Sequence, residues 1–218
     1  MIRVGVVDSG GPEVATGEGR AFLADGSTAP QTPDVLGHGT TVAGIISRAC
    51  PAAHIIHAQV FHDRPLTSAV RVAAALRWLA GLADPPRLIC LSLGLREDRA
   101  VLRAAVQSIL RPGLLLVAAH PAQGAPCFPA AYPGVIAATG DARCGWDQIS
   151  VLGPALFGAW CDSPEHRPGG IGGASLGAAR LTGHLAAMLA AGAALDDVAA
   201  ATRLLSERAS FHGAERRG

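Results

Sequence analysis

The chain has 218 residues, half of them hydrophobic, and a formal net charge of only +1. This length and composition can bury a large core and fit one domain better than two. We therefore expect a single domain over residues 1–218, with a frayed polar tail from about residue 210. Lysine is absent and the arginines are dispersed, which excludes nucleic acid as a partner because such binding needs a clustered basic face.

The sequence also bears on location and on metals. Residues 1–4 lead directly into a strand-like run without a signal-peptide pattern. The most apolar long stretch, 181–194, is shorter than the roughly 20 residues that span a bilayer. We expect a cytoplasmic protein without a membrane segment. The five cysteines show no C-x-x-C spacing, and no Asp-rich segment suits calcium, so we expect no disulfide framework, no metal and no cofactor.

Strands and helices alternate along the predicted chain. Short apolar runs predict strands at 2–7, 54–60, 88–93, 114–119 and 135–139. Apolar residues at helical spacing predict helices from His38, at 69–83, at 99–110, from Ser175 and at 195–207. We expect a loop with at most a short strand over 12–36, and an irregular region or edge hairpin over 141–168. This alternation predicts an α/β, three-layer fold in which helices cover both faces of a mostly parallel central sheet.

Three residues with chemical potential stand at the ends of predicted elements. Asp8 follows the first strand, at the edge of a parallel sheet where reacting groups collect. His38 lies between two glycines at a helix start, and Ser175 follows the Gly-rich run 169–173 at another helix start. Backbone N–H groups at such a start point toward whatever the serine hydroxyl attacks. A serine hydroxyl becomes a strong nucleophile when an imidazole, oriented by a carboxylate, takes its proton.

The order Asp8, His38, Ser175 and the surrounding residues resemble the subtilisin family of serine peptidases. The matching strings are VGVVDSG at 4–10, GHGTTVAG at 37–44, LSLG at 91–94, YPGVIA at 132–137 and GASLGAA at 173–179. The resemblance implies a subtilisin-like fold and a serine endopeptidase with Ser175 as nucleophile, His38 as general base and Asp8 orienting it. It also implies that Ser92, Leu93 and Gly94 pair with the backbone of an extended polypeptide substrate.

The sequence departs from the family pattern around the nucleophile and the oxyanion hole. The family usually has Thr before the serine and Pro four residues after it, where this chain has Ala174 and Ala179. The family's oxyanion-hole Asn falls at Ala122, and the chain contains no Asn at all. His120 and Gln123 are the candidate replacements. We therefore expect a slow peptidase, or one whose oxyanion is held by these side chains and the backbone N–H of Ser175.

The compact chain points to limited proteolysis. Because Asp8 stands so near the start of the sequence, we expect neither the signal nor the propeptide of secreted subtilisins before it. The chain most resembles the compact cytoplasmic subtilisin-like peptidases that remove a leader from the small, crosslinked subunit of quinohemoprotein amine dehydrogenase. A leader-bearing subunit of that kind is therefore the expected partner.

Two other functions remain open from the sequence. The missing Asn favours a catalytically weak or inactive relative that binds a peptide as an assembly factor, whereas the intact Asp, His and Ser favour catalysis. The Gly-rich runs at 10–11 and 169–173 suggest a nucleotide-binding domain, but the G-x-G-x-x-G pattern is missing after the first strand.

Overall fold

The computed structural model describes residues 1–12, 18–161 and 173–214. Its strands are β1 (Ile2–Asp8), β2 (Arg20–Phe22), β3 (Thr28–Pro30), β4 (Ala53–Gln59), β5 (Leu88–Leu91), β6 (Leu115–Ala119), β7 (Val135–Gly140), β8 (Ile149–Gly153), β9 (Leu156–Ala159) and β10 (Phe211–His212). Its helices are α1 (His38–Ala49), α2 (Ala69–Ala80), α3 (Ala100–Ile109), α4 (Ala174–Ala190) and α5 (Val198–Glu207). None of the helices in these ranges is both long and apolar enough to cross a membrane.

The described strands form one sheet in the order β10-β8-β9-β7-β6-β5-β1-β4-β2-β3. Neighbouring strands are parallel except in two hairpins near the edges, β2–β3 and β8–β9. The central strands β5 and β6 are buried along their whole length, which explains why they have no polar face in the sequence. The predicted mostly parallel sheet is confirmed.

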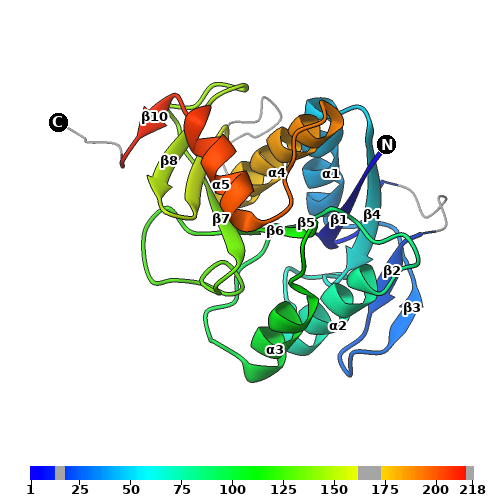
Figure 1. Cartoon of the computed structure of the whole chain (residues 1–218). Helices are drawn as coiled ribbons and strands as arrows, with labels where there is room; N and C mark the ends of the chain where they lie inside the picture. Colours follow the sequence, from blue (N-terminus) through cyan, green and yellow to red (C-terminus); the bar gives the residue numbers. More distant parts are fainter. Residues whose placement is uncertain (13–17, 162–172, 215–218) are drawn as a thin grey trace.

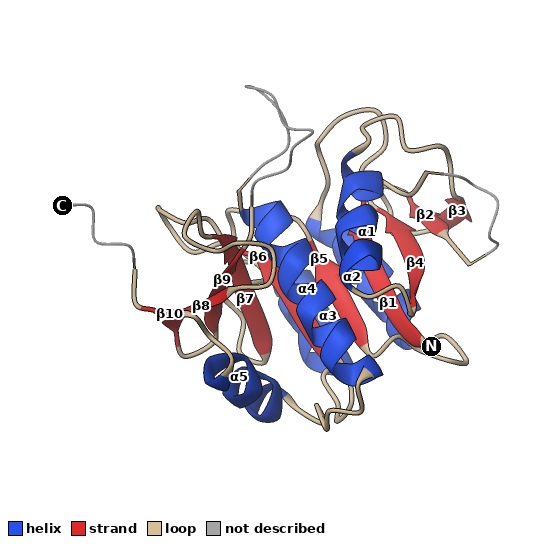
Figure 2. Ribbon diagram, turned by 90° about the horizontal axis from the view of Figure 1, so that it is seen from above, coloured by secondary structure: helices blue, strands red, loops and turns tan. Residues whose placement is uncertain are grey.

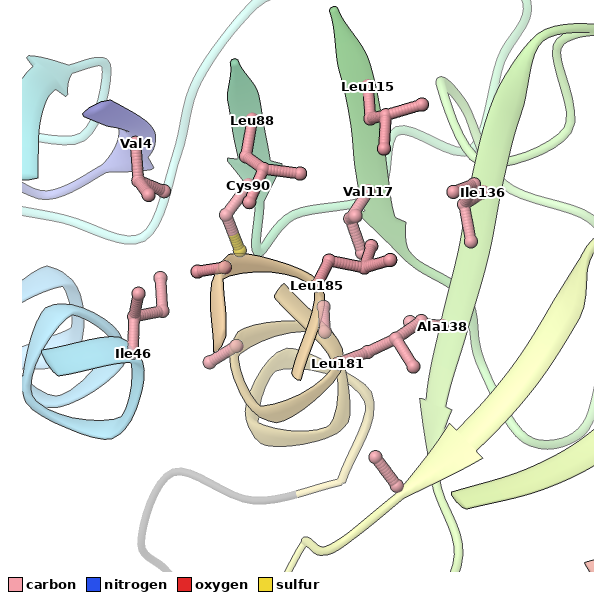
Figure 3. Close-up of a cluster of buried hydrophobic side chains, with 14 of the residues drawn as sticks. Val4, Ile46, Leu88, Cys90, Leu115, Val117, Ile136, Ala138, Leu181 and Leu185 are labelled. Carbon is pink, nitrogen blue, oxygen red and sulfur yellow. The ribbon is translucent and has the colours of Figure 1, made fainter. Parts of the chain in front are cut away.

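Helices cover both faces of this sheet, as predicted (Figures 1 and 2). On one face, α1 and α4 pack against the central strands through an apolar cluster that includes Ile46, Leu181 and Leu185 (Figure 3). On the other face, α2 and α3 bury a second cluster against the same strands. Fully burying a Leu or Ile side chain contributes about 1.5–3 kcal/mol, so these two clusters supply the main force that holds the three layers together.

Some predicted boundaries were wrong. The tail is not frayed at 211–212, because β10 pairs with β8 and the amide of Ser210 donates to the carbonyl of Ile149. The last helix begins at Val198 instead of residue 195, because the Asp197 side chain caps it by accepting from the amide of Ala200 at 2.7 Å. The edge hairpin expected within 141–168 is β8–β9, and residues 162–168 lie outside the described residues.

The fold gathers the ends of several elements at one edge of the sheet. β1 and β5 are parallel neighbours, so Asp8 and the segment that follows Leu91 leave the sheet on the same side. α1 and α4 both begin at that edge and lie side by side on the sheet (Figure 2). The crossover topology therefore brings together residues 8, 38, 92 and 175, which are far apart in the sequence.

Candidate active site

Asp8 ends β1 with its carboxylate completely buried. The amide of Ser9 donates to Asp8 Oδ1 at 2.7 Å, and the Ser9 hydroxyl donates to the same oxygen at 3.2 Å. The hydroxyl of Ser92, which follows β5, donates to Asp8 Oδ2. A buried carboxylate is costly unless it is hydrogen-bonded, and these donors hold Asp8 in one orientation.

His38 is the first residue of α1, and its imidazole faces this carboxylate. Its Nδ1 lies 2.7 Å from Asp8 Oδ1 and 2.8 Å from Asp8 Oδ2. The close approach depends on Gly39, where a Cβ would come within 2.2 Å of the carbonyl oxygen of Gly10. Gly37 precedes the helix with a φ of 69°, a conformation that favours glycine. The two glycines beside His38 are therefore explained by its position.

The start of α1 is held by Asp34. Its carboxylate accepts from the amides of Gly37 and Thr40, each at 2.9 Å, and from the Thr40 hydroxyl at 2.7 Å. Burial would raise the pKa of Asp34, but these hydrogen bonds outweigh burial and lower it. Asp34 is therefore an anion next to His38, and it caps the helix at the end that favours negative charge.

Opposing effects set the pKa of His38. Burial alone would lower it, since a charged imidazole loses hydration. The hydrogen bond to Asp8 and the negative charges of Asp8 and Asp34 outweigh burial, so the pKa of His38 is raised above 6.5. A raised pKa gives a stronger base, and Nδ1 bound to Asp8 leaves Nε2 to accept a proton.

Ser175 lies in the first turn of α4, after Gly173, whose φ of 71° again favours glycine. Its hydroxyl donates to the carbonyl oxygen of Ser92 at 2.9 Å. Among the described residues, no hydrogen bond joins Ser175 to His38. Ser92 therefore connects the two sides of the site, with its carbonyl on Ser175 and its hydroxyl on Asp8.

A cavity of about 700 Å³ opens beside this site. Asp8, His38 and the three residues predicted to bind substrate, Ser92, Leu93 and Gly94, all contribute to its lining. The remaining walls are mainly apolar and include Leu36, Phe61, Leu66 and Leu95. The cavity therefore offers an extended chain both backbone partners and space for apolar side chains.

The two oxyanion candidates line a second cavity, and Gly140 in its lining lies against Gly173, two residues before Ser175. His120 and Gln123 line a separate cavity of about 560 Å³, together with Thr139 and Asp141. His120 Nδ1 is 2.7 Å from the carbonyl oxygen of Pro121, so it donates there. Within the described ranges, neither side chain makes a hydrogen bond to Ser175. The amides in the first turn of α4 are the donors nearest in sequence to the nucleophile.

Sequence reasoning missed two contacts of the site. Ser92 was expected to bind substrate through its backbone, and its hydroxyl contact with Asp8 was not foreseen. Asp34 was placed in an unstructured loop, because it stands three residues before the N-cap Gly37 and not at the N-cap position where a capping residue is recognised from sequence. In the described part of the chain, no group of three or more His, Cys, Asp or Glu side chains is placed to hold a metal ion.

Comparison with known proteins gives consistent results. The chain is 35% identical over 144 residues to the subtilisin-like protease het-Q2 of Podospora anserina, covering 61% of this chain and 37% of that protein. It is 30% identical over 150 residues to subtilisin Savinase of Lederbergia lenta, covering 62% of this chain and 54% of that protein. The alignments thus span only about a third to a half of these relatives.

The fold is similar to that of a cold-adapted subtilisin-like serine proteinase, with a TM-score of 0.72 and 22% identity over 96% of this chain and 84% of that one. Residues 4–151 match the model of the Subtilase family, in a segment that contains Asp8 and His38 and ends before Ser175. The chain therefore belongs to the subtilase family.

Proposed function

We propose that this protein is a serine endopeptidase in which Ser175 is the nucleophile, His38 the general base and Asp8 the residue that orients it. The observation that carries the proposal is the contact of His38 Nδ1 with both oxygens of a fully buried Asp8, at 2.7 and 2.8 Å. This contact fixes the tautomer and directs Nε2 away from Asp8, as general base catalysis requires.

The proposed reaction has two stages, acylation of Ser175 and hydrolysis of the ester. Ser175 turns about its Cα–Cβ bond from the Ser92 carbonyl toward His38, and its hydroxyl proton passes to Nε2 as Oγ attacks the peptide carbonyl carbon. The C–N bond then breaks, and the imidazolium gives its proton to the departing amine. Water hydrolyses the resulting ester with His38 again acting as base. The negative charges of Asp8 and Asp34 stabilise the imidazolium in both steps.

The substrate is an extended polypeptide that lies along Ser92, Leu93 and Gly94 with apolar side chains in the adjoining cavity. We propose limited proteolysis, the removal of a leader from a partner in the cytoplasm. The resemblance to leader-removing peptidases supports the leader-bearing small subunit of quinohemoprotein amine dehydrogenase as that partner. Cys50, Cys90, Cys127 and Cys144 are buried thiols, which suits a reducing compartment.

An active-site probe tests the proposal. A fluorophosphonate should form one adduct, located by mass spectrometry on Ser175, and His38→Ala should abolish it. Incubation with leader-bearing peptides then locates the cleaved bond. The absence of any adduct, with or without the partner, would contradict the peptidase assignment.

One observation favours a second function, that of a catalytically weak or inactive peptide-binding assembly factor. The Ser175 hydroxyl is directed to the Ser92 carbonyl, and no Asn occurs in the chain to complete an oxyanion hole. Tight binding of a leader peptide without an adduct on Ser175 would support this function.

A further inference from the structure

Gln59, the last residue of β4, is a fully buried polar residue next to the proposed catalytic residues. It is paired with Asp8 in the β1–β4 register, and these two strands lie side by side (Figure 1). Its side-chain Nε2 donates to the carbonyl oxygen of Ser9 at 2.9 Å. Its Oε1 accepts from the amide of Thr32 at 2.9 Å and from the Thr32 hydroxyl at 3.1 Å. One amide group thus joins two separate segments.

The first of these segments supports the carboxylate and the helix together. The Ser9 hydroxyl accepts from the amide of Gly39 in α1 at 2.9 Å and donates to Asp8 Oδ1 at 3.2 Å. Ser9 is therefore the point at which the turn after β1 contacts the helix that carries His38. A displacement of the Ser9 backbone would move both contacts at once.

The second segment leads to the helix cap. Thr32 precedes Asp34 by two residues, and Asp34 holds the amides of Gly37 and Thr40 on either side of His38. Fixing Thr32 therefore limits where Asp34, and with it the start of α1, can lie.

We propose that Gln59 is a positioning residue for the acid–base pair: it fixes Ser9 and Thr32 relative to each other, and so keeps Asp8 and His38 in hydrogen-bonding contact. The role suits glutamine, because the site needs a donor toward Ser9 and an acceptor toward Thr32 on one neutral group. An apolar residue supplies neither partner, and a carboxylate lacks the donor. The inference rests on the proposed function, in which this pair is the base.

Gln31 provides a matched control in the same buried layer. It is only 9% exposed, and a Cβ at Gly10 would come within 3.3 Å of its Nε2. That Nε2 has no hydrogen-bond partner among the residues that the structure describes. Gln59→Met and Gln31→Met therefore make the same chemical change, and only the first removes bonds to the two supporting segments.

The experiment measures the fluorophosphonate labelling rate of the full chain against pH for wild type, Gln59→Met and Gln31→Met. Since a misplacement of about 1 Å can cost on the order of 10²-fold, we expect Gln59→Met to slow labelling by about that factor and Gln31→Met to leave it unchanged. The pH midpoint of Gln59→Met should also fall, because a loosened contact with Asp8 raises the pKa of His38 less. Asp8 and Asp34 are the charged groups facing His38, and His57 on β4 lies near both.

A second readout does not depend on activity. NMR titration of the His38 imidazole, assigned by its loss in His38→Ala, should give a lower pKa in Gln59→Met than in wild type and Gln31→Met. Equal His38 pKa values in all three proteins would overturn the inference, even if none of them labels. If Gln59→Met does not fold, Gln59→Asn keeps a neutral amide but shortens the side chain by one methylene, and it should show the same direction of change without adding a charge near His38. If the wild type never labels but the His38 pKa is still lower in Gln59→Met, the proposed peptidase function is contradicted and the positioning role of Gln59 is supported.

Discussion

The two halves of the candidate site are built to different degrees. The acid–base half comprises Asp8, Ser9, Asp34 and His38. Hydrogen bonds of 2.7–3.2 Å join Asp8 at the end of its strand to Ser9 and His38, and Asp34 caps the helix by accepting from the amides of Gly37 and Thr40 at 2.9 Å. The nucleophile half, comprising Ser175 and the loop 120–124, has the serine hydroxyl on a backbone carbonyl and alanine at the expected oxyanion position. The match to the Subtilase family also ends before Ser175.

Under the proposed function, this difference indicates which part of the site would limit the rate. A general base needs one well-oriented imidazole, which the acid–base half supplies. Stabilising an oxyanion needs donors already aimed at the developing charge, and the amides of α4 supply only part of such a set. We therefore expect a peptidase whose base is strong and whose acylation is slow.

The largest effect should come from breaking the acid–base half. Asp8→Asn should lower the Ser175 labelling rate by about 10⁴-fold, the loss that the same change causes in other serine-peptidase triads, because the amide favours the wrong imidazole tautomer. The measurement is the labelling time course at fixed pH. Asp197→Asn, at the N-cap of α5, makes the same chemical change outside the site and is the control, which should label normally. Similar rates for the two variants would show that Asp8 has no special role.

The next effect should come from completing the nucleophile half. Ala122→Asn restores the side-chain donor and should raise the labelling and hydrolysis rates, by up to about 10²–10³-fold if the amide reaches the oxyanion. Ala122→Leu is the size control and should not accelerate the reaction. If Ala122→Asn has no effect while His120→Ala or Gln123→Ala slows acylation, one of those side chains is the donor after all.

A smaller effect is expected at Asp34. Asp34→Asn removes a negative charge near His38 and weakens the helix cap. The pH midpoint of labelling should fall by less than about one unit, and the loss of the cap should cost about 1 kcal/mol of unfolding free energy. Parallel pH–rate and urea-unfolding curves measure the two effects. An unchanged midpoint would mean that Asp34 acts only as a cap.

A further effect, on stability alone, lies outside the site, at His184 in α4. Burial, with Arg180 and Arg208 nearby, lowers the pKa of His184 to about 3, so the folded state resists protonation that the unfolded state accepts below about 6.5. Stability should therefore fall with decreasing pH below 6.5, at up to about 1.4 kcal/mol per pH unit from this group. His184→Leu should reduce that slope in urea unfolding between pH 7.5 and 5. The raised pKa of His38 changes stability in the opposite direction, and it does so in both proteins. Equal slopes in wild type and His184→Leu would contradict the lowered pKa of His184.

The sequence predicted the sheet and most helices because their apolar periods are strong. Val42, Ile45 and Ile46 show the helical period that buries α1, and the wholly apolar β6 runs through the centre of the sheet. The final strand β10 was missed because two residues, Phe211 and His212, carry no readable period. It forms only because β8 offers an open edge.

The same distinction applies to the candidate site. Asp8 and His38 could be predicted because each stands at the end of a regular element within a recognisable string. Gln59 and the hydroxyl of Ser92 could not, since their roles depend on the register that places them beside Asp8. The loop at His120 was the least predictable part, because its geometry depends on local contacts such as that of the His120 side chain with the carbonyl oxygen of Pro121.

The pH dependence of Ser175 labelling tests the central claim most directly. If His38, paired with Asp8, is the working base of a site limited by its nucleophile half, the wild-type rate should be slow and should rise with pH to a half-maximum above 6.5. His38→Ala should remove the rise. A rate that is flat between about pH 5 and 9, or that His38→Ala leaves unchanged, would contradict the account.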